Sequence, residues 1–177
     1  MQAAIYGMAG ASLTPDERAF FRDADAAGYI VFRRNCEDQA QLLRLTDDLR
    51  DIAGRPDVPI LIDQEGGRVM RMRPPNWPSF PPADVFARLY QAAPSSAIEA
   101  ARSNARAIAL TLKSCGINVN CLPLLDVRQE GAADIIGDRA LGDEPMQVAA
   151  LGRAVLEGMA SAGVVGVIKH IPGHGRA

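Results

Sequence analysis

Side chains able to bind a ligand or move protons gather in three polar segments of the chain. The first is 63–71, which begins with Asp63 and ends with Arg71. A carboxylate at its start could hold hydroxyl groups or act as an acid or base. Gly66 and Gly67 let the backbone turn tightly and approach a ligand. Arg71 lies eight residues after Asp63 and could fold back to the same site. The alternative interpretation is a turn that carries a solvated ion pair.

The second polar segment, 169–175, contains both histidines of the chain. His170 and His174 have the i, i+4 spacing of a metal-binding pair on a helix. Pro172 and Gly173 lie between them and prevent that helix, and the sequence offers no third ligand nearby. The segment therefore predicts polar contacts to a ligand, with a capped buried turn as the alternative.

The third polar segment is the loop 134–142, where Arg139 is a candidate clamp because its planar guanidinium suits two acceptors. Asp126 and Arg128 could form a structural ion pair just before this loop. Trp77 could offer a stacking wall to a ligand, but its Pro-rich surroundings favour a rigid surface loop.

The elements that must position these segments follow from alternating apolar and amphipathic patterns. Five short apolar runs predict strands, at 3–6, 29–32, 59–62, 117–122 and 164–168. Four stretches predict helices, at 14–27, 38–53, 95–115 and 145–162. Thr14 and Glu17 match a capping box at the start of the first helix, and Gly28 is a typical residue to end it.

Strict alternation of strands and helices predicts an α/β fold with a parallel sheet and right-handed crossovers. An open doubly wound sheet and a (β/α)8 TIM barrel both fit this pattern. Polar residues follow four strands, at 33–35, 63–65, 126 and 169–170. In a barrel all strand ends meet at one mouth, whereas an open sheet places its site at one switch point. No G-x-G-x-x-G follows the first strand, and the pattern favours the barrel.

A complete barrel takes roughly 250 residues, whereas this chain has 177. We therefore expect a truncated barrel with about five βα units. On this interpretation residues 1–177 are the N-terminal part of one barrel domain, without its C-terminal strands and helices.

Composition narrows the class of protein further. The chain is 48% hydrophobic and 23% charged with a formal net charge of −2, which is typical of a globular domain and not of a nucleic-acid binder. Three cysteines, an odd number without zinc spacing, predict reduced thiols in a cytosolic protein. The pattern of a signal peptide and a run long enough to span a membrane are both missing from the sequence.

The polar segments together resemble glycoside hydrolase family 3, in its branch of bacterial cytosolic β-N-acetylhexosaminidases. The resemblance rests on four segments in the family's order, namely 63–69 with Arg71, 122–127, 136–142 and 169–175. It implies a (β/α)8 barrel that removes terminal, non-reducing β-linked N-acetylglucosamine, chiefly from peptidoglycan fragments during cell-wall recycling. The partner would be a small carbohydrate, with no metal or organic cofactor and no nucleic acid or membrane.

The resemblance also implies which residues hold the sugar. Five positions match the family's sugar-binding groups: Asp63, Arg71, Arg139, Lys169 and His170. The family's retaining mechanism needs an Asp nucleophile and a His acid/base, and both positions are expected beyond Ala177, so that His174 is not the acid/base. We therefore expect this chain to bind sugar without hydrolysing it. Two alternatives are a non-catalytic sugar-binding remnant of the family and an unrelated α/β module.

Overall fold

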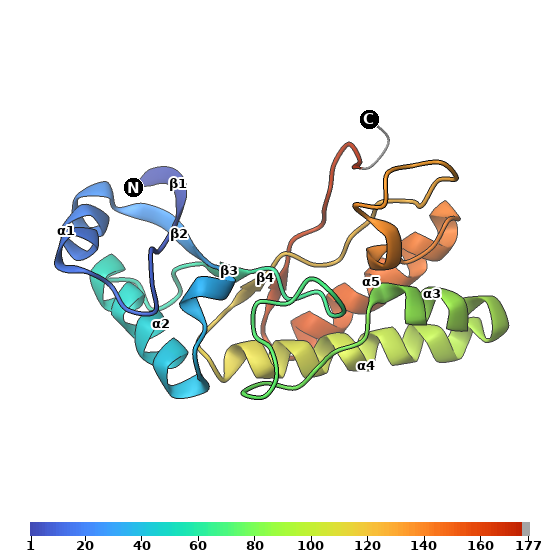
Figure 1. Ribbon diagram of the computed structural model, residues 1–177, viewed down its shortest axis with the longest axis horizontal. Coiled ribbons are helices and arrows are strands. Elements are labelled where there is room, and N and C mark those ends of the chain that lie inside the picture. Colours follow the sequence, from blue (N-terminus) through green and yellow to red (C-terminus); the bar gives the residue numbers. More distant parts are fainter. Residues whose placement is uncertain (175–177) are drawn as a thin grey trace.

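The computed structural model describes residues 1–174, so Gly175 at the end of the second polar segment lies outside the described residues. The strands are β1 (Gln2–Gly7), β2 (Ala26–Val31), β3 (Ile60–Ile62), β4 (Val119–Asn120) and β5 (Val165–Gly166). They form one parallel sheet in the order β1-β2-β3-β4-β5 (Figure 1). Each strand therefore lies beside its neighbour in sequence, as in a barrel wall, without the order reversal of a doubly wound sheet.

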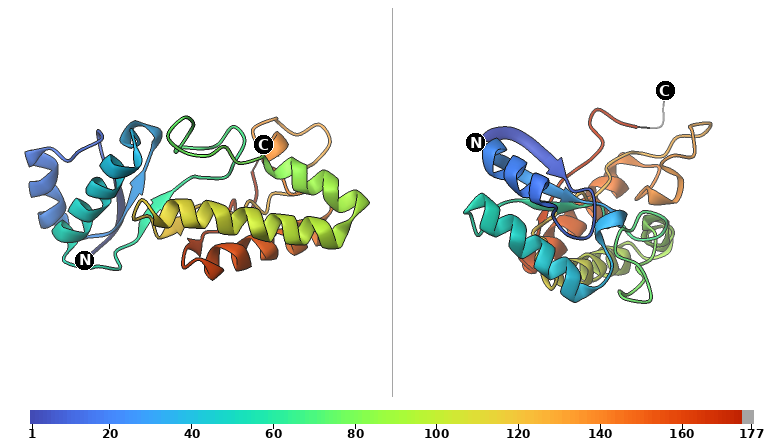
Figure 2. Two further views of the ribbon diagram at one scale, coloured as in Figure 1. Left: turned by 90° about the horizontal axis from the view of Figure 1, so that it is seen from below. Right: turned by 60° about the vertical axis from the view of Figure 1, so that its left-hand side comes forward.

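Five α-helices connect these strands. They are α1 (Pro15–Ala24), α2 (Gln39–Ala53), α3 (Ala83–Ala92), α4 (Pro94–Lys113) and α5 (Pro145–Ser161), and two short 3-10 helices, η1 (Arg33–Asn35) and η2 (Gly137–Arg139), follow strand ends. The long helices α4 and α5 pack against each other on one side of the sheet (Figures 1 and 2). The loop after β4 and the C-terminal segment extend away from α4 and α5 (Figure 1).

Helix α3 was not predicted, so residues 1–174 contain five α-helices where the sequence predicted four. It begins directly after Pro82 and buries Phe86 and Ala87. Pro94 is the first residue of α4, and a proline there cannot continue the preceding helix, so two helices form in place of one. The start of α3 is not recognisable in the sequence because it directly follows a Pro-rich stretch and has no side-chain cap.

The start of α1 was predicted correctly, but its end was not. Thr14 and Glu17 form the expected capping box, with Glu17 N donating to Thr14 Oγ1 at 3.1 Å. The helix ends at Ala24, and the residue that caps it, Asp25, has a φ of 42°. Gly28 lies within β2, where a Cβ would sit 2.8 Å from Pro59 O. Gly28 therefore serves the close approach of neighbouring backbones and does not end the helix.

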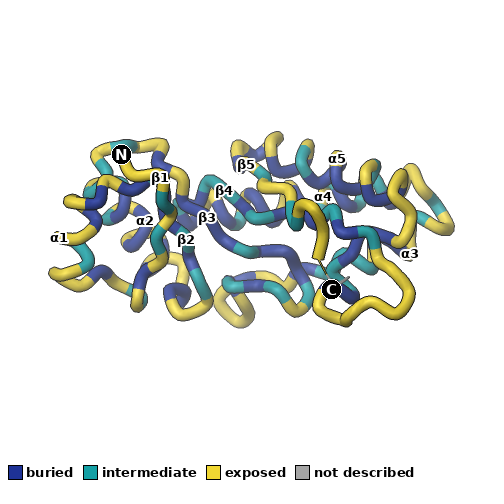
Figure 3. Tube along the Cα trace, turned by 90° about the horizontal axis from the view of Figure 1, so that it is seen from above, coloured by how far each residue is buried: buried dark blue, intermediate teal, exposed yellow. Residues whose placement is uncertain are grey.

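The core lies along the strands and the helix sides that face them (Figure 3). Trp77 belongs to this core with 6% of its surface exposed, which corrects the expectation of a surface loop. The polar segment after β2 serves the fold, because Asn35 Nδ2 donates to Met8 O at 3.1 Å and Gly10 O at 2.7 Å. These bonds tie the end of β2 to the end of β1.

Two further observations concern the cysteines and membranes. Cys36, Cys115 and Cys121 are free thiols, and burial raises the pKa of Cys36 to about 12. A helix able to cross a membrane would need to be longer or more apolar than any in residues 1–174.

Candidate functional site

The site is built at the carboxyl ends of β3, β4 and β5, and its first part is the turn after β3. Gln64 anchors this turn through its backbone, which exchanges hydrogen bonds with the side chain of the buried Asn120 on β4 at 3.0 and 2.9 Å. The Gln64 side chain accepts from the backbone N–H groups of Arg71 and Met72 at 2.9 and 3.1 Å. The chain thus folds back on itself, as its sequence predicted.

Two glycines make the turn possible. Gly66 and Gly67 have φ values of 106° and 56°, and a Cβ on Gly66 would lie 2.2 Å from Pro81 O. The returning segment places Arg71 Nη2 3.0 Å from Asp63 Oδ2. The expectation that Arg71 folds back onto Asp63 is therefore confirmed.

Lys169 brings the C-terminal segment into contact with this turn. Its backbone pairs with the segment after β4, because Lys169 N donates to Pro123 O at 3.1 Å and Leu125 N donates to Lys169 O at 2.6 Å. The side chain reaches two carboxylates, with Nζ 2.9 Å from Asp63 Oδ1 and 2.6 Å from Glu65 Oε1. Lys169 and Asp63 are 106 residues apart, so the sheet brings them together.

These contacts keep Asp63 ionised. Burial alone would raise the pKa of Asp63, but the hydrogen bonds and positive charges of Lys169 and Arg71 outweigh burial and lower it below its ordinary value of 3.8. Asp63 is therefore a charged acceptor at neutral pH, able to take hydrogen bonds from hydroxyl groups.

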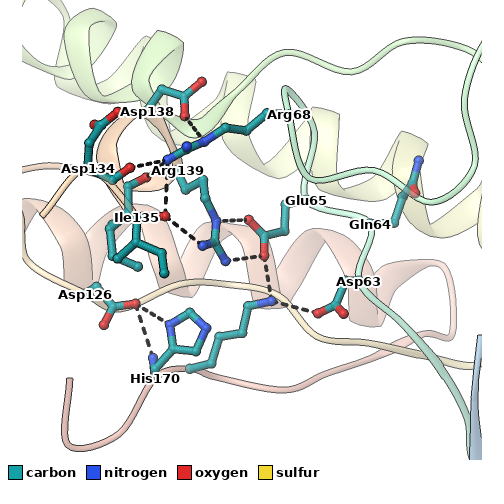
Figure 4. A network of polar contacts seen from close by, with 12 residues as sticks. Asp63, Gln64, Glu65, Arg68, Asp126, Asp134, Ile135, Asp138, Arg139 and His170 are labelled. Carbon is teal, nitrogen blue, oxygen red and sulfur yellow. Dashed lines mark hydrogen bonds and ion pairs between the residues drawn. The ribbon is translucent and has the colours of Figure 1, made fainter. Parts of the chain in front are cut away.

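Arg139 on η2 meets the same cluster from the loop after β4. Its Nε and Nη2 lie 2.8 and 2.9 Å from the two carboxylate oxygens of Glu65, and Nη1 donates to Ile135 O at 3.0 Å (Figure 4). The hydrogen bonds to Glu65 raise the pKa of Arg139 against the opposing effect of burial. The predicted clamp thus grips a carboxylate of the protein itself.

Glu65 is the central residue that sequence reasoning missed. It joins Arg139 and Lys169 with its side chain only 5% exposed. The available signal was a second acid two positions after the strand-end Asp63. In the assembled cluster two carboxylates, Asp63 and Glu65, face three cations, and this surplus of donors suits a ligand rich in oxygen.

Arg68 fastens the loop that carries Arg139. Its Nη2 lies 2.7, 3.1 and 3.1 Å from the carbonyl oxygens of Asp134, Ile135 and Ile136. Its Nε pairs with Asp138 at 2.9 Å (Figure 4). Arg68 of the turn after β3 therefore binds the loop after β4, and Arg139 of that loop binds Glu65 of the turn.

His170 lies beside Lys169 and is held by Asp126. Its Nδ1 is 2.7 Å from Asp126 Oδ2 (Figure 4). The expected ion pair between Asp126 and Arg128 is wrong, because Asp126 bonds to the 170–174 segment, where it also accepts from His174 N at 2.8 Å. The cause is the pairing of Leu124 with Lys169, which brings the two segments side by side.

A hollow of about 420 Å³ adjoins this cluster. It is lined by residues 126–134 together with Ile136, Gly137, Asp143 and His174. Within residues 1–174 the structure contains no group of three or more His, Cys, Asp or Glu side chains arranged to hold a metal ion. The described site is thus an array of hydrogen-bonding and charged groups beside an open hollow, an arrangement that can bind a polar ligand.

Comparison with known proteins finds a family model and curated relatives that match nearly the whole of this chain. The family model described as the glycosyl hydrolase family 3 N-terminal domain matches residues 6–177. A β-hexosaminidase of Xanthomonas oryzae is 36% identical over 171 residues, which cover 97% of this chain and 50% of that protein. A β-hexosaminidase of Xylella fastidiosa matches with the same identity and coverage. The chain spans about half the length of these curated relatives.

Solved structures agree with the fold described above. NagZ from Neisseria gonorrhoeae, solved in complex with N-trifluoroacetyl-D-glucosamine, superposes with a TM-score of 0.90 at 33% identity over 97% of this chain and 50% of that one. A family 3 β-N-acetylglucosaminidase from Paenibacillus has a TM-score of 0.88 at 32% identity, covering 97% of this chain and 32% of its own. The predicted barrel-type arrangement of alternating strands and helices is confirmed.

Proposed function

The chain belongs to glycosyl hydrolase family 3, and from this premise we propose that it forms the N-terminal part of the (β/α)8 catalytic domain of a β-N-acetylhexosaminidase. The reaction is hydrolysis of terminal, non-reducing β-linked N-acetylglucosamine with retention of configuration. The substrates are N-acetylglucosamine-containing peptidoglycan fragments (muropeptides), recycled in the cytoplasm. The names of the relatives and the ligand in the matching NagZ structure support this sugar class.

One observation carries the proposal: the charged cluster at the strand ends. Asp63 and Glu65 after β3 meet Lys169 after β5 and Arg139 from the loop after β4. We assign sugar binding to the five residues Asp63, Arg71, Arg139, Lys169 and His170. Charged donors and acceptors in this fixed array would bond to the hydroxyls of the non-reducing sugar and strengthen those bonds as its ring distorts.

We assign the chemical step to residues beyond Ala177. A retaining glycosidase needs two catalytic groups, a nucleophile and an acid/base. In this chain the carboxylates of the cluster are bound by cations, and Asp126 is bound by His170. Residues 1–177 are therefore proposed to bind the sugar without cleaving it.

Binding and turnover of the 177-residue chain test this proposal together. Titration with N-acetylglucosamine, followed by calorimetry or NMR, should show saturable binding that Asp63→Asn weakens at least about tenfold, because bonds to a charged group are lost. Asp48→Asn is the matched control, since Asp48 also sits in an ion pair, with Arg18, but away from the cluster. Equal weakening by both variants would contradict the site.

A chromogenic β-N-acetylglucosaminide tests the assignment of the chemistry. We expect no turnover by residues 1–177. Turnover by residues 1–177 would show that the assignment of the chemical step is wrong.

A further inference from the structure

Asp126 is a buried carboxylate that holds both ends of the segment with the two histidines. Its side chain is 2% exposed. Oδ2 accepts from His170 N at 3.3 Å and lies 2.7 Å from His170 Nδ1, while Oδ1 accepts from His174 N at 2.8 Å. A single side chain thus fixes the backbone at positions 170 and 174 and the imidazole ring of His170.

The partners of Asp126 decide which nitrogen of His170 carries its proton. An ionised carboxylate has only acceptor sites, and the two backbone N–H groups that reach Asp126 are both donors. A short contact between Nδ1 and Oδ2 is then a hydrogen bond only if Nδ1 is protonated. A neutral imidazole ring carries one proton on its two nitrogens. If that proton is on Nδ1, Nε2 is unprotonated and has a free lone pair.

The ring is also held in place by its neighbour. The rings of His170 and His174 meet edge to face, with centroids 5.2 Å apart. A flip of the His170 ring would break the bond to Asp126 and leave that carboxylate oxygen without its ring partner in a buried site. The geometry therefore selects one orientation as well as one tautomer.

We propose that Asp126 is a positioning residue that holds His170 in the Nδ1–H tautomer and so makes Nε2 a hydrogen-bond acceptor for a ligand hydroxyl. Lys169, Arg71 and Arg139 can only donate, and the carboxylates they touch are already ion-paired. Within residues 1–174 the ring bonds only through Nδ1. Nε2 thus adds to Asp63 an uncharged acceptor for the hydrogen of a hydroxyl. The identity of that hydroxyl as a sugar hydroxyl rests on the proposed function.

Long-range proton–nitrogen NMR of the 177-residue chain with 15N-labelled histidine tests the tautomer directly, without any ligand. The chain has only two histidines, so His174→Gln assigns the signals. In the neutral ring we expect His170 to show a protonated Nδ1 and an unprotonated Nε2, the form that a free histidine disfavours. An Nε2–H form, or fast exchange between the two forms, would overturn the proposal.

Asp126→Asn tests whether Asp126 is the cause. The carboxamide has no charge and would turn an N–H group toward one of the donors, so we expect the pure Nδ1–H form to give way to a mixture. Asp143→Asn is the matched control, because Asp143 is exposed and lines the same hollow, and it should leave the His170 signals unchanged. A pure Nδ1–H form in Asp126→Asn would overturn the role of Asp126. The wild-type spectrum decides the question if this variant does not fold.

Titration with N-acetylglucosamine separates this inference from the proposed function. In the wild type the Nε2 signal should shift as the sugar binds, and Asp126→Asn should bind on the order of fivefold more weakly, the loss of about one hydrogen bond. An Asp126→Asn chain that has lost the tautomer but binds as the wild type does would overturn the acceptor role. A wild type that binds no sugar would contradict the proposed function, while the ligand-free spectrum still decides the role of Asp126.

Discussion

Glu65 and Arg139 are 74 residues apart in the sequence and meet in a two-pronged ion pair, with N–O distances of 2.8 and 2.9 Å. The pair joins the turn after β3 to the loop after β4, and Lys169 adds a third strand end to it. A buried pair of this kind contributes little stability over an apolar substitute, but breaking it leaves an unpaired charge at high cost. Its value here is that it fixes the positions of the cationic groups in the site.

Replacement of Glu65 by Gln should therefore destabilise the fold strongly. The carboxylate is almost fully buried, and removing one partner of a buried pair costs about 3–5 kcal/mol. The free energy of unfolding from urea titration measures the loss. Glu157→Gln is the control, since Glu157 pairs with Arg102 and Arg153 at the surface and should change stability little. Similar losses in both variants would contradict a special role for the buried pair.

Arg68 should control the mobility of the loop after β4. Its guanidinium binds three successive carbonyls and Asp138, so Arg68→Ala should speed hydrogen exchange of backbone amides in residues 134–142. Arg68→Lys should restore only part of the protection, because an ammonium group cannot reproduce the planar fork. Hydrogen exchange read by mass spectrometry checks this. Unchanged exchange in Arg68→Ala would show that the clamp does not hold the loop.

Asp63 should make stability depend on pH in the acid range. Its pKa in the folded chain is lower than the ordinary value of 3.8, so the unfolded chain binds the proton more readily. The stability that Asp63 contributes is therefore fully present above that value and is lost as pH falls through the folded-state pKa. Unfolding free energies of the wild type and Asp63→Asn should differ most near neutral pH and converge in acid. A difference that stays constant with pH would contradict the ion-pair assignment.

The crossing of α4 and α5 should depend on Gly158. A Cβ at this position would lie 2.2 Å from Arg102 O and 3.0 Å from the Ala105 Cβ. Gly158→Ala should lower the thermal midpoint even though alanine favours helices by about 1 kcal/mol over glycine. Gly152→Ala in the same helix is the control, because its Cβ meets chiefly the flexible end of Leu125, and it should cost less. A stabilised Gly158→Ala chain would contradict the close crossing.

Features that depend on a few neighbouring residues could be predicted from the sequence. Thr14 with Glu17 sets the start of α1, and Asp38 and Gly54 cap the two ends of α2, through bonds within one turn of chain. The glycines at 66 and 67 returned Arg71 to Asp63, only eight positions away. The alternation of strands and helices likewise determined a parallel sheet. The residues responsible for these features are close together in the sequence, so a local sequence pattern is enough to predict them.

The partners of the remaining groups depend on how the strands and loops assemble in three dimensions. Gly28 and Trp77 were misjudged because their roles depend on a neighbouring strand and on a loop that packs into the core. Glu65 pairs with Arg139, and Asp126 pairs with His170 and not with Arg128. Both pairs form because the register of the strands sets which of the following loops lie side by side. A shift of that register by one residue would displace the loops that follow the strands and separate these pairs. Pairs of residues far apart in the sequence can therefore be identified only from the assembled sheet.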